Sequence, residues 1–252
     1  METERRRYSY RYVIETRFTP AVEYHFFKLR AVPCECSFQH LQQTSLRICP
    51  DCSWKVSTDG YGNAVQYGGF SSLHDFFTVE CEGIVECQRY EIPDDSPADY
   101  YLFPTRLTEW KRKMCPVEPC MPEDIMHWVH CHIEYQRFAT TTSTTAQEAF
   151  VLGKGVCQDY AHLMIAVCRS AGLKARYVNG LLLGEGETHA WVEVHDGHCW
   201  RGYDPTHDRI IDWGYVKIAH GRDADDCPCN RGRIYAWTSE MLTVTANLKE
   251  ME

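Results

Sequence analysis

One of the fourteen cysteines, Cys157, stands where the chain could make a reactive thiol. It follows Gly153-Lys154-Gly155 and starts a predicted helix over residues 157–171. The unpaired N–H groups and the dipole at a helix start stabilise an anion, so they favour a thiolate and a substrate oxyanion here. A buried packing cysteine fits the position equally well, because Cys157 also begins an apolar stripe that continues with Ala161, Met164, Ile165 and Cys168.

A second chemical residue, His189, starts a predicted strand over residues 189–195. The Asp196-Gly197 pair that follows is typical of a two-residue hairpin turn. Such a turn pairs residue 195 with 198 and, in the same register, His189 with Asp204, whose Cβ atoms would be ~5 Å apart. Asp204 would then orient the ring and leave its other nitrogen for the Cys157 thiol. The sequence therefore predicts a nucleophile, a base and an orienting carboxylate.

Other polar and aromatic residues near this group have simpler interpretations. Asp159 lies in the first turn of the predicted helix, where capping explains it better than catalysis. His162 points to another helix face and is interpreted as structural or surface-exposed. Trp191 and Trp200 fit a substrate groove, although strand aromatics more often belong to the core. If the turn is longer than two residues, the fallback acid–base residues are His195, His198, His207 and Asp208.

The N-terminal elements form a region of their own. Residues 8–92 consist mainly of alternating, β-branched and aromatic runs separated by Pro, Gly and Asp-Gly turns. This pattern predicts an antiparallel β-sandwich with strands over 8–18, 24–32, 38–48, 64–69 and 75–86. A polar, proline-rich segment follows at 92–99. We therefore predict an N-terminal β-sandwich domain, 1–98, and a second domain, 99–252, that would carry the chemistry.

The second region mixes helices and strands, so the predicted fold class is α+β. Helices are predicted over 122–133, 146–152 and 157–171, and Gly172 ends the third. Strands are predicted over 175–183, 189–195 and 198–203. Two further apolar stretches, 213–219 and 234–248, complete the chain.

Composition disfavours several kinds of partner. A chain of 252 residues that is 44% hydrophobic can bury a core without disulfides or metals. Its net charge of −9 disfavours nucleic acid, because binding a phosphate backbone requires clustered cations. The sequence shows neither the ~18 apolar residues of a spanning helix nor the apolar segment of a signal peptide. We therefore expect a cytoplasmic protein with no membrane or nucleic-acid partner.

The remaining cysteines and histidines raise the question of a metal. In a reducing compartment, cysteines are thiols, metal ligands or nucleophiles before they are disulfides. Two pairs resemble the halves of a zinc site: Cys34 with Cys36, and Cys49 with Cys52. The strand predicted between them carries the pairs to opposite ends, so zinc is the less favoured alternative. Three histidines of one predicted helix lie on different faces: His127, His130 and His132. We expect no metal and no cofactor.

Several motifs together resemble the bacterial transglutaminase-like superfamily. The core motifs are GVCQDYAH at 155–162, ARYVNG at 175–180, HAW at 189–191 and YDPT at 203–206. The resemblance extends to that family's N-terminal β-rich region at 24–30 and 59–63. It also extends to its C-terminal signature at 221–223 and 231–232. The likeness covers nearly the whole chain, and the ordered core motifs are specific.

The resemblance implies a papain-like core in which the helix bearing the cysteine packs on an antiparallel sheet. It also implies a catalytic triad of Cys157, His189 and Asp204. Members of the family include transglutaminases, cysteine proteases and amidases, which share thiolate attack on an amide and a thioester intermediate. The small chain without a calcium motif favours a hydrolase, a cysteine peptidase or amidase acting on peptides or proteins. The alternatives are a protein-glutamine acyltransferase and a non-catalytic peptide-binding module.

Overall fold

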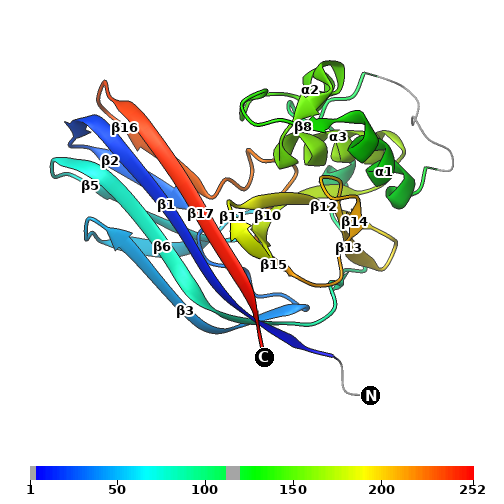
Figure 1. Ribbon diagram of the computed structural model, residues 1–252, viewed down its shortest axis with the longest axis horizontal. Helices are drawn as coiled ribbons and strands as arrows, with labels where there is room; N and C mark the ends of the chain where they lie inside the picture. The colour runs from blue at the N-terminus through cyan, green and yellow to red at the C-terminus, as the bar shows by residue number, and fades with distance from the viewer. Residues whose placement is uncertain (1–3, 112–119) are drawn as a thin grey trace.

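The computed structural model describes residues 4–111 and 120–252 (Figure 1). The strands of the first half are β1 (Arg6–Val22), β2 (His25–Leu29), β3 (Gln39–Cys49), β4 (Trp54–Thr58), β5 (Ala64–Phe70), β6 (His74–Cys87) and β7 (Ile92–Pro93). The helices are the 3-10 helix η1 (Asp99–Leu102) and α1 (Pro122–His132), α2 (Ala146–Leu152) and α3 (Cys157–Ser170). The strands that follow are β8 (Glu134–Tyr135), β9 (Lys154–Gly155), β10 (Ala175–Leu182), β11 (Gly184–Gly186), β12 (His189–His195), β13 (Cys199–Asp204), β14 (Arg209–Ile210), β15 (Tyr215–Gly221), β16 (Asn230–Ile234) and β17 (Ser239–Met251).

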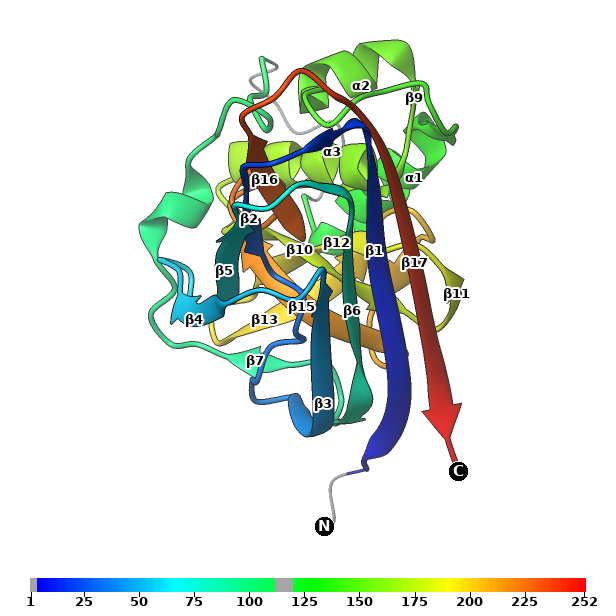
Figure 2. The same cartoon turned by 90° about the vertical axis from the view of Figure 1, so that its left-hand side faces the viewer.

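The strands form three larger sheets, and the described residues agree with the predicted α+β class. The sheet orders are β11-β17-β1-β6-β3, then β14-β13-β12-β10-β15 with β7 beside β13, and β16-β2-β5-β4. All pairs in these sheets are antiparallel. Figures 1 and 2 show β17, in red, running beside β1, in blue. The C-terminal strands β16 and β17 thus pair with N-terminal strands, while a division into domains at residue 98 stays a prediction.

The N-terminal strands follow from the alternation of the sequence. In β1 the buried side chains of Tyr8, Tyr10 and Tyr12 alternate with exposed or half-exposed ones. Strand β4 was not predicted from the sequence. Its residues 54–57 alternate between apolar and polar, but the strand is only five residues long and all five side chains are exposed. Rings of Phe27 and Phe77, on the four- and five-stranded sheets, lie 5.2 Å apart and join these sheets in one core. That the two sheets make a sandwich stays a prediction.

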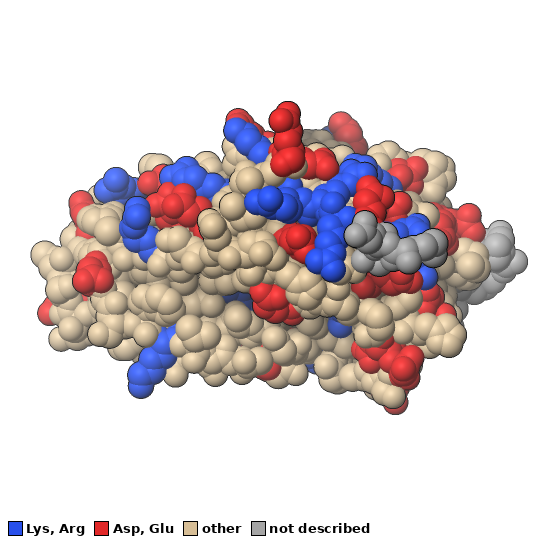
Figure 3. Space-filling model, turned by 90° about the horizontal axis from the view of Figure 1, so that it is seen from below, with Lys and Arg blue, Asp and Glu red and all other residues tan. Residues whose placement is uncertain are grey.

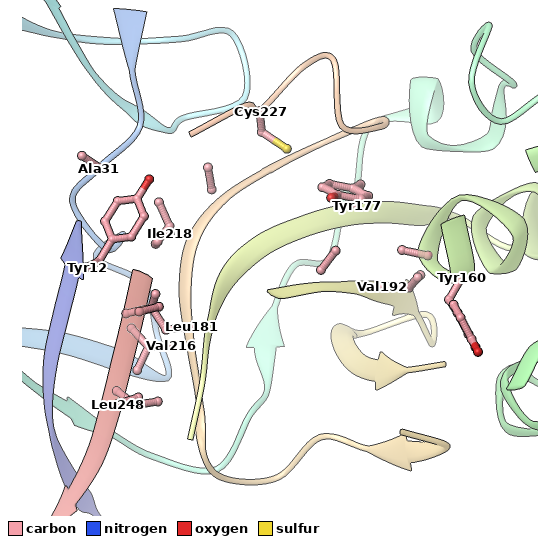
Figure 4. Close-up of a cluster of buried hydrophobic side chains, with 14 of the residues drawn as sticks. Tyr12, Ala31, Tyr160, Tyr177, Leu181, Val192, Val216, Ile218, Cys227 and Leu248 are labelled. Carbon is pink, nitrogen blue, oxygen red and sulfur yellow. The ribbon is translucent and has the colours of Figure 1, made fainter. Parts of the chain in front are cut away.

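The central six-stranded sheet is covered by helices on one side, and α3 contacts both β12 and β10 (Figure 1). The five-stranded sheet packs against the central sheet as well. Figure 4 shows Tyr12 and Leu248, from β1 and β17, beside Leu181, Val216 and Ile218 of the central sheet. All five side chains are buried. The central sheet, which carries His189 and Asp204, therefore packs against both the helices and the five-stranded sheet.

The surface carries both signs of charge. Lys and Arg side chains are interspersed with Asp and Glu on the face shown in Figure 3. This face therefore offers no uniformly basic surface, although the absence of a nucleic-acid partner stays a prediction. None of the helices formed by residues 4–111 and 120–252 has the length and apolar character needed to cross a bilayer.

Replacing Gly180 with alanine is expected to destabilise the central sheet. A Cβ atom there would lie 2.2 Å from the Val216 carbonyl oxygen and 2.4 Å from the Trp191 ring, and the backbone oxygen cannot turn away. Overpacking of this kind costs roughly 1–3 kcal/mol of the free energy of unfolding, measured by urea denaturation. Gly186→Ala is the matched control, because nothing lies within 4 Å of its added Cβ. Equal stability of the two variants would contradict this packing argument.

Candidate active site

The turn before Cys157 places this residue at the start of α3. Gly155 precedes the helix, and a Cβ atom on it would lie 2.6 Å from the Asp159 side chain, so only glycine leaves room. Asp159 Oδ2 accepts a hydrogen bond from the Val156 N–H at 2.8 Å. The predicted capping role of Asp159 is thereby confirmed. Asp159 and Gly155 together fix where the helix begins, and Cys157 is its first residue.

The β12–β13 hairpin differs from the predicted one. His195 pairs with Trp200 and not with residue 198, so four residues, 196–199, separate the first paired positions instead of two; within them the Asp196 N–H donates to the Cys199 carbonyl at 3.1 Å. The Asp196 carboxylate accepts hydrogen bonds from the N–H groups of His198 and Cys199, both at 2.9 Å. These bonds stabilise the longer turn, and the Asp-Gly signal alone could not reveal them. The prediction that His189 lies directly opposite Asp204 is therefore wrong.

The predicted contact between His189 and Asp204 nevertheless exists. The register moved by two residues, and because side chains alternate with a period of two, both residues stay on the same face of the sheet. His189 Nε2 lies 2.7 Å from Asp204 Oδ2, and both side chains are buried. Since Nε2 is taken, the Nδ1 atom of the ring is left for a thiol.

Asp204 receives more hydrogen bonds than the sequence suggested. Its Oδ2 is 2.8 Å from His207 Nδ1 and accepts the Tyr215 hydroxyl at 2.7 Å, and its Oδ1 accepts the Thr206 N–H at 2.9 Å. Burial works to raise the pKa of Asp204, but the bonds from the two histidines and Tyr215 hold it well below its usual range. Tyr215 was missed, because β15 comes beside this site only in the folded sheet and no local pattern marks it.

Cys157 and His189 line the same cavity, which has a volume of about 580 Å³. Burial works against a charge on the His189 ring. Hydrogen bonds to Asp204 and to the Cys157 sulfur outweigh it and raise the pKa of His189 to about 10. The structure thus brings together all three residues predicted from the sequence. A thiol at a helix start beside an imidazolium is an arrangement that stabilises a thiolate.

The fallback acid–base residues are placed differently from one another. His207 lines the cavity, and its ring centre is 5.2 Å from that of His189. His195 hydrogen-bonds a backbone carbonyl, and His198 is exposed in the hairpin turn. Asp208 hydrogen-bonds an exposed histidine of α1 at 2.7 Å. Of these four residues, His207 alone is among those that line the cavity.

His162 and the two tryptophans are structural. His162 is fully buried, and its Nε2 accepts the Ala224 N–H at 3.2 Å. Burial lowers the pKa of His162 to about 3, so the ring is neutral at physiological pH. The structural interpretation is confirmed and the surface alternative is wrong. Trp191 and Trp200 are fully buried as well, so they belong to the core and not to a substrate groove.

The described residues offer one group with metal-like spacing. The candidate ligand atoms of His189, Asp204 and His207 lie within 4.8 Å of one another. Asp204 Oδ2 already makes hydrogen bonds with both rings and with Tyr215, and we interpret the group as a hydrogen-bond network. Strand β3 ends at Cys49 and begins after Cys36, so it separates the two cysteine pairs as predicted. This separation argues against one metal shared by both pairs.

A thiol and an imidazole in one cavity, on a helix start and an antiparallel sheet, are typical of the transglutaminase-like proteins. Residues 105–205 match the Transglutaminase-like superfamily. Residues 8–86 match the Bacterial transglutaminase-like N-terminal region. The chain belongs to the transglutaminase-like superfamily, and the resemblance found in its motifs is confirmed.

The relatives come from several bacteria. An uncharacterized protein of Mycobacterium tuberculosis is 30% identical over an alignment covering 71% of this chain and 72% of the relative. An uncharacterized protein of Mycobacterium leprae is 37% identical over 109 residues, 39% of either chain. Among solved structures, a candidate cysteine protease from Cytophaga hutchinsonii has a TM-score of 0.82 at 21% identity, covering 99% of this chain and 92% of that one. This last likeness shows a shared fold.

Replacing Tyr215 with phenylalanine is expected to lower the free energy of unfolding by about 1.5–3 kcal/mol, because its hydroxyl donates to a buried carboxylate. Tyr10→Phe is the control: its hydroxyl contacts the neutral Thr44, and the expected loss is about 0.5–1.5 kcal/mol. Asp204 contributes stability above the usual aspartate pKa of 3.8 and loses it as the pH falls towards its lower folded value. The effect of Tyr215→Phe should therefore shrink in acid. Urea denaturation at several pH values measures both effects, and equal losses for the two variants would contradict the argument.

Proposed function

We propose that this protein is a thiol enzyme that cleaves amide bonds of peptides or proteins through Cys157, His189 and Asp204. The observation that carries the proposal is the shared cavity, in which the thiol at the start of α3 lies beside a ring that Asp204 holds by Nε2. Membership of the superfamily supports it. So does the fold shared with the Cytophaga hutchinsonii protein, which is described as a candidate cysteine protease.

The first half of the proposed reaction uses Cys157 as a thiolate and His189 as an imidazolium. The Cys157 thiolate attacks the carbonyl carbon of the amide, and the oxyanion that forms is stabilised by N–H groups at the start of α3. The N–H groups of Asp159 and Tyr160 already bond the Val156 carbonyl, so those of Cys157 and Gln158 are the donors we assign to the oxyanion. The His189 imidazolium gives its proton to the leaving amine, and the acyl group stays on sulfur as a thioester.

The second half decides between hydrolysis and transfer to an amine. His189, now neutral, removes a proton from the incoming water or amine, which attacks the thioester and releases Cys157. Cys157 is only partly buried, and the side chain of His207, which lines the same cavity, is 49% exposed. Water can therefore reach the thioester, which supports a hydrolase over an acyltransferase.

We also propose that the enzyme works in the cytoplasm. The support is the number of cysteines: eleven of those among the described residues are free thiols. A reducing compartment keeps such thiols from forming disulfides.

The test incubates the purified protein with a mixture of synthetic peptides, with and without methylamine, and analyses the products by mass spectrometry. Products that have gained water in both samples support the hydrolase. Products that gain methylamine in preference to water indicate the acyltransferase. If no peptide changes and Cys157 reacts with iodoacetamide no faster than the other thiols, the proposal is wrong and a peptide-binding module is favoured.

A further inference from the structure

Phe138 holds an aromatic ring in solvent at the edge of the proposed catalytic cavity. The residue lines that cavity, is 97% exposed, and has a φ of 64°. A non-glycine residue rarely adopts this left-handed conformation, and a large apolar side chain gains nothing from exposure to water. Both features are unfavourable in the free protein. Strain and exposure of this kind concentrate where a ligand binds.

The other exposed apolar side chains of the cavity complete one apolar surface. Tyr135, at the end of β8, is 51% exposed, and Leu183, between β10 and β11, is 47% exposed. They line the same cavity as Phe138 but come from two separate parts of the chain. An apolar group placed in the cavity could therefore contact aromatic and aliphatic side chains of two segments.

The charged side chains of the cavity wall are neutralised within the protein. Arg137 and Glu187 form an ion pair at 2.8 Å. Glu185 accepts a hydrogen bond from Asn247 at 2.8 Å and lies 3.7 Å from the Lys249 ammonium. Among the described residues that line the cavity, the Arg, Lys, Asp and Glu side chains are those of Arg137, Glu185 and Glu187. The wall therefore offers a substrate side chain exposed apolar contact but no uncompensated charge.

We propose that the cavity selects acyl donors with an aromatic or branched aliphatic side chain beside the reacting carbonyl, and that Phe138 determines this specificity. The inference rests on the proposed function. The acyl half of the substrate stays bonded to Cys157 through both half-reactions, whereas the amine half leaves after the first. The side chains that line the cavity around Cys157 can therefore contact the acyl half of the substrate during both half-reactions.

The test measures how fast Cys157 reacts with peptide vinyl sulfones that differ in one side chain. The Cys157 thiolate adds to the terminal vinyl carbon, and the carbon beside the sulfone takes up a proton, so no group leaves. Acetyl-Gly-Phe and acetyl-Gly-Asp vinyl sulfones are compared by intact-protein mass spectrometry, with peptide mapping to locate the label. We expect the phenylalanyl probe to react roughly ten-fold faster, because one apolar side chain in a pocket discriminates by about this factor or more.

The variant Phe138→Gly removes the ring and keeps the backbone conformation, because glycine readily adopts a positive φ. It should abolish most of the preference for the phenylalanyl probe. Trp237→Ala is the matched control: this ring is 98% exposed but lies outside the cavity, and its loss should leave the preference unchanged. Iodoacetamide, which has no such side chain, should alkylate Cys157 at the same rate in all three proteins.

The outcomes separate the two proposals. If iodoacetamide does not select Cys157 in the unmodified protein and no peptide of the mixture changes, the proposed function fails. If iodoacetamide selects Cys157, but the two vinyl sulfones react equally fast or Phe138→Gly keeps the preference, the specificity proposal is wrong and the thiol enzyme stands.

Discussion

Replacing Cys157 with alanine is expected to lower turnover by roughly 10⁴-fold or more, because the sulfur forms the thioester. Among the described residues that line the cavity, no other cysteine is present to replace it. The free energy of unfolding should change by less than about 1 kcal/mol, since the side chain is only partly buried. Turnover of a peptide found in the mixture assay and urea denaturation of the same variant measure the two quantities. Loss of activity with a normal unfolding curve is the expected result, and substantial residual turnover would contradict it.

The reactivity of Cys157 has an internal comparison in Cys131. Cys131 is exposed, its sulfur lies 3.6 Å from His127 Nε2, and His127 Nδ1 is 2.7 Å from an Asp208 oxygen. The partners are of the same types, but Cys131 lies in the last turn of α1, where the helix dipole disfavours an anion. We therefore expect iodoacetamide to label Cys157 before Cys131 near neutral pH, although Cys131 is more accessible. Preferential labelling of Cys131, located by peptide mapping, would show that the helix start does not activate the thiol.

Replacing Asp204 with asparagine is expected to lower turnover by about 10³–10⁴-fold, since the ring loses its orienting carboxylate. It should also change the charge of His189. Burial opposes the charge on this ring, and the bonds to Asp204 and Cys157 raise the pKa to about 10, so the ring is an imidazolium at pH 8. Without the carboxylate, the pKa should fall by about 1–3 units. Nitrogen NMR of the histidine side chains, recorded at several pH values below and above 8, measures the fall in the pKa of His189 directly.

Cys157→Ala provides the comparison for this titration. It keeps the bond between His189 and Asp204 but removes the sulfur, so His189 should lose part of its elevated pKa and not all of it. The stability that the charged ring contributes is present below the unfolded histidine pKa of 6.5 and is lost as the pH rises through about 10. If His189 is neutral at pH 8 in the unmodified protein, or if Asp204→Asn leaves its titration unchanged, the network does not act as described.

Local sequence was sufficient for the elements that bear the candidate site. Gly155 and Asp159 are close in the chain to Cys157, so the start of α3 was predicted to the residue. The strand from His189 to His195 was predicted with its observed bounds because its side chains alternate. The contact between His189 and Asp204 survived a wrong register, because an error of two residues keeps both side chains on the same face.

Other parts of the fold could not be predicted from local sequence patterns. The four-residue turn depends on hydrogen bonds from the Asp196 side chain, and Asp-Gly alone is compatible with more than one turn length. Strand β4 is only five residues long and buries none of its side chains, so it is specified by its pairing with β5. The apolar stretch near the C-terminus was recognised, but its partner β1 lies more than two hundred residues away in sequence, and no pattern within a strand names its neighbour.

The sequence by itself determined which residues could react and on which elements they lie, because helix starts, strand faces and glycine turns are set by residues a few positions apart. Only the tertiary structure decided that Tyr215 donates to the Asp204 carboxylate, and that Phe138 lies at the edge of the Cys157 cavity. Such contacts depend on how separate elements pack, and the packing free energy is summed over many side chains of the whole core.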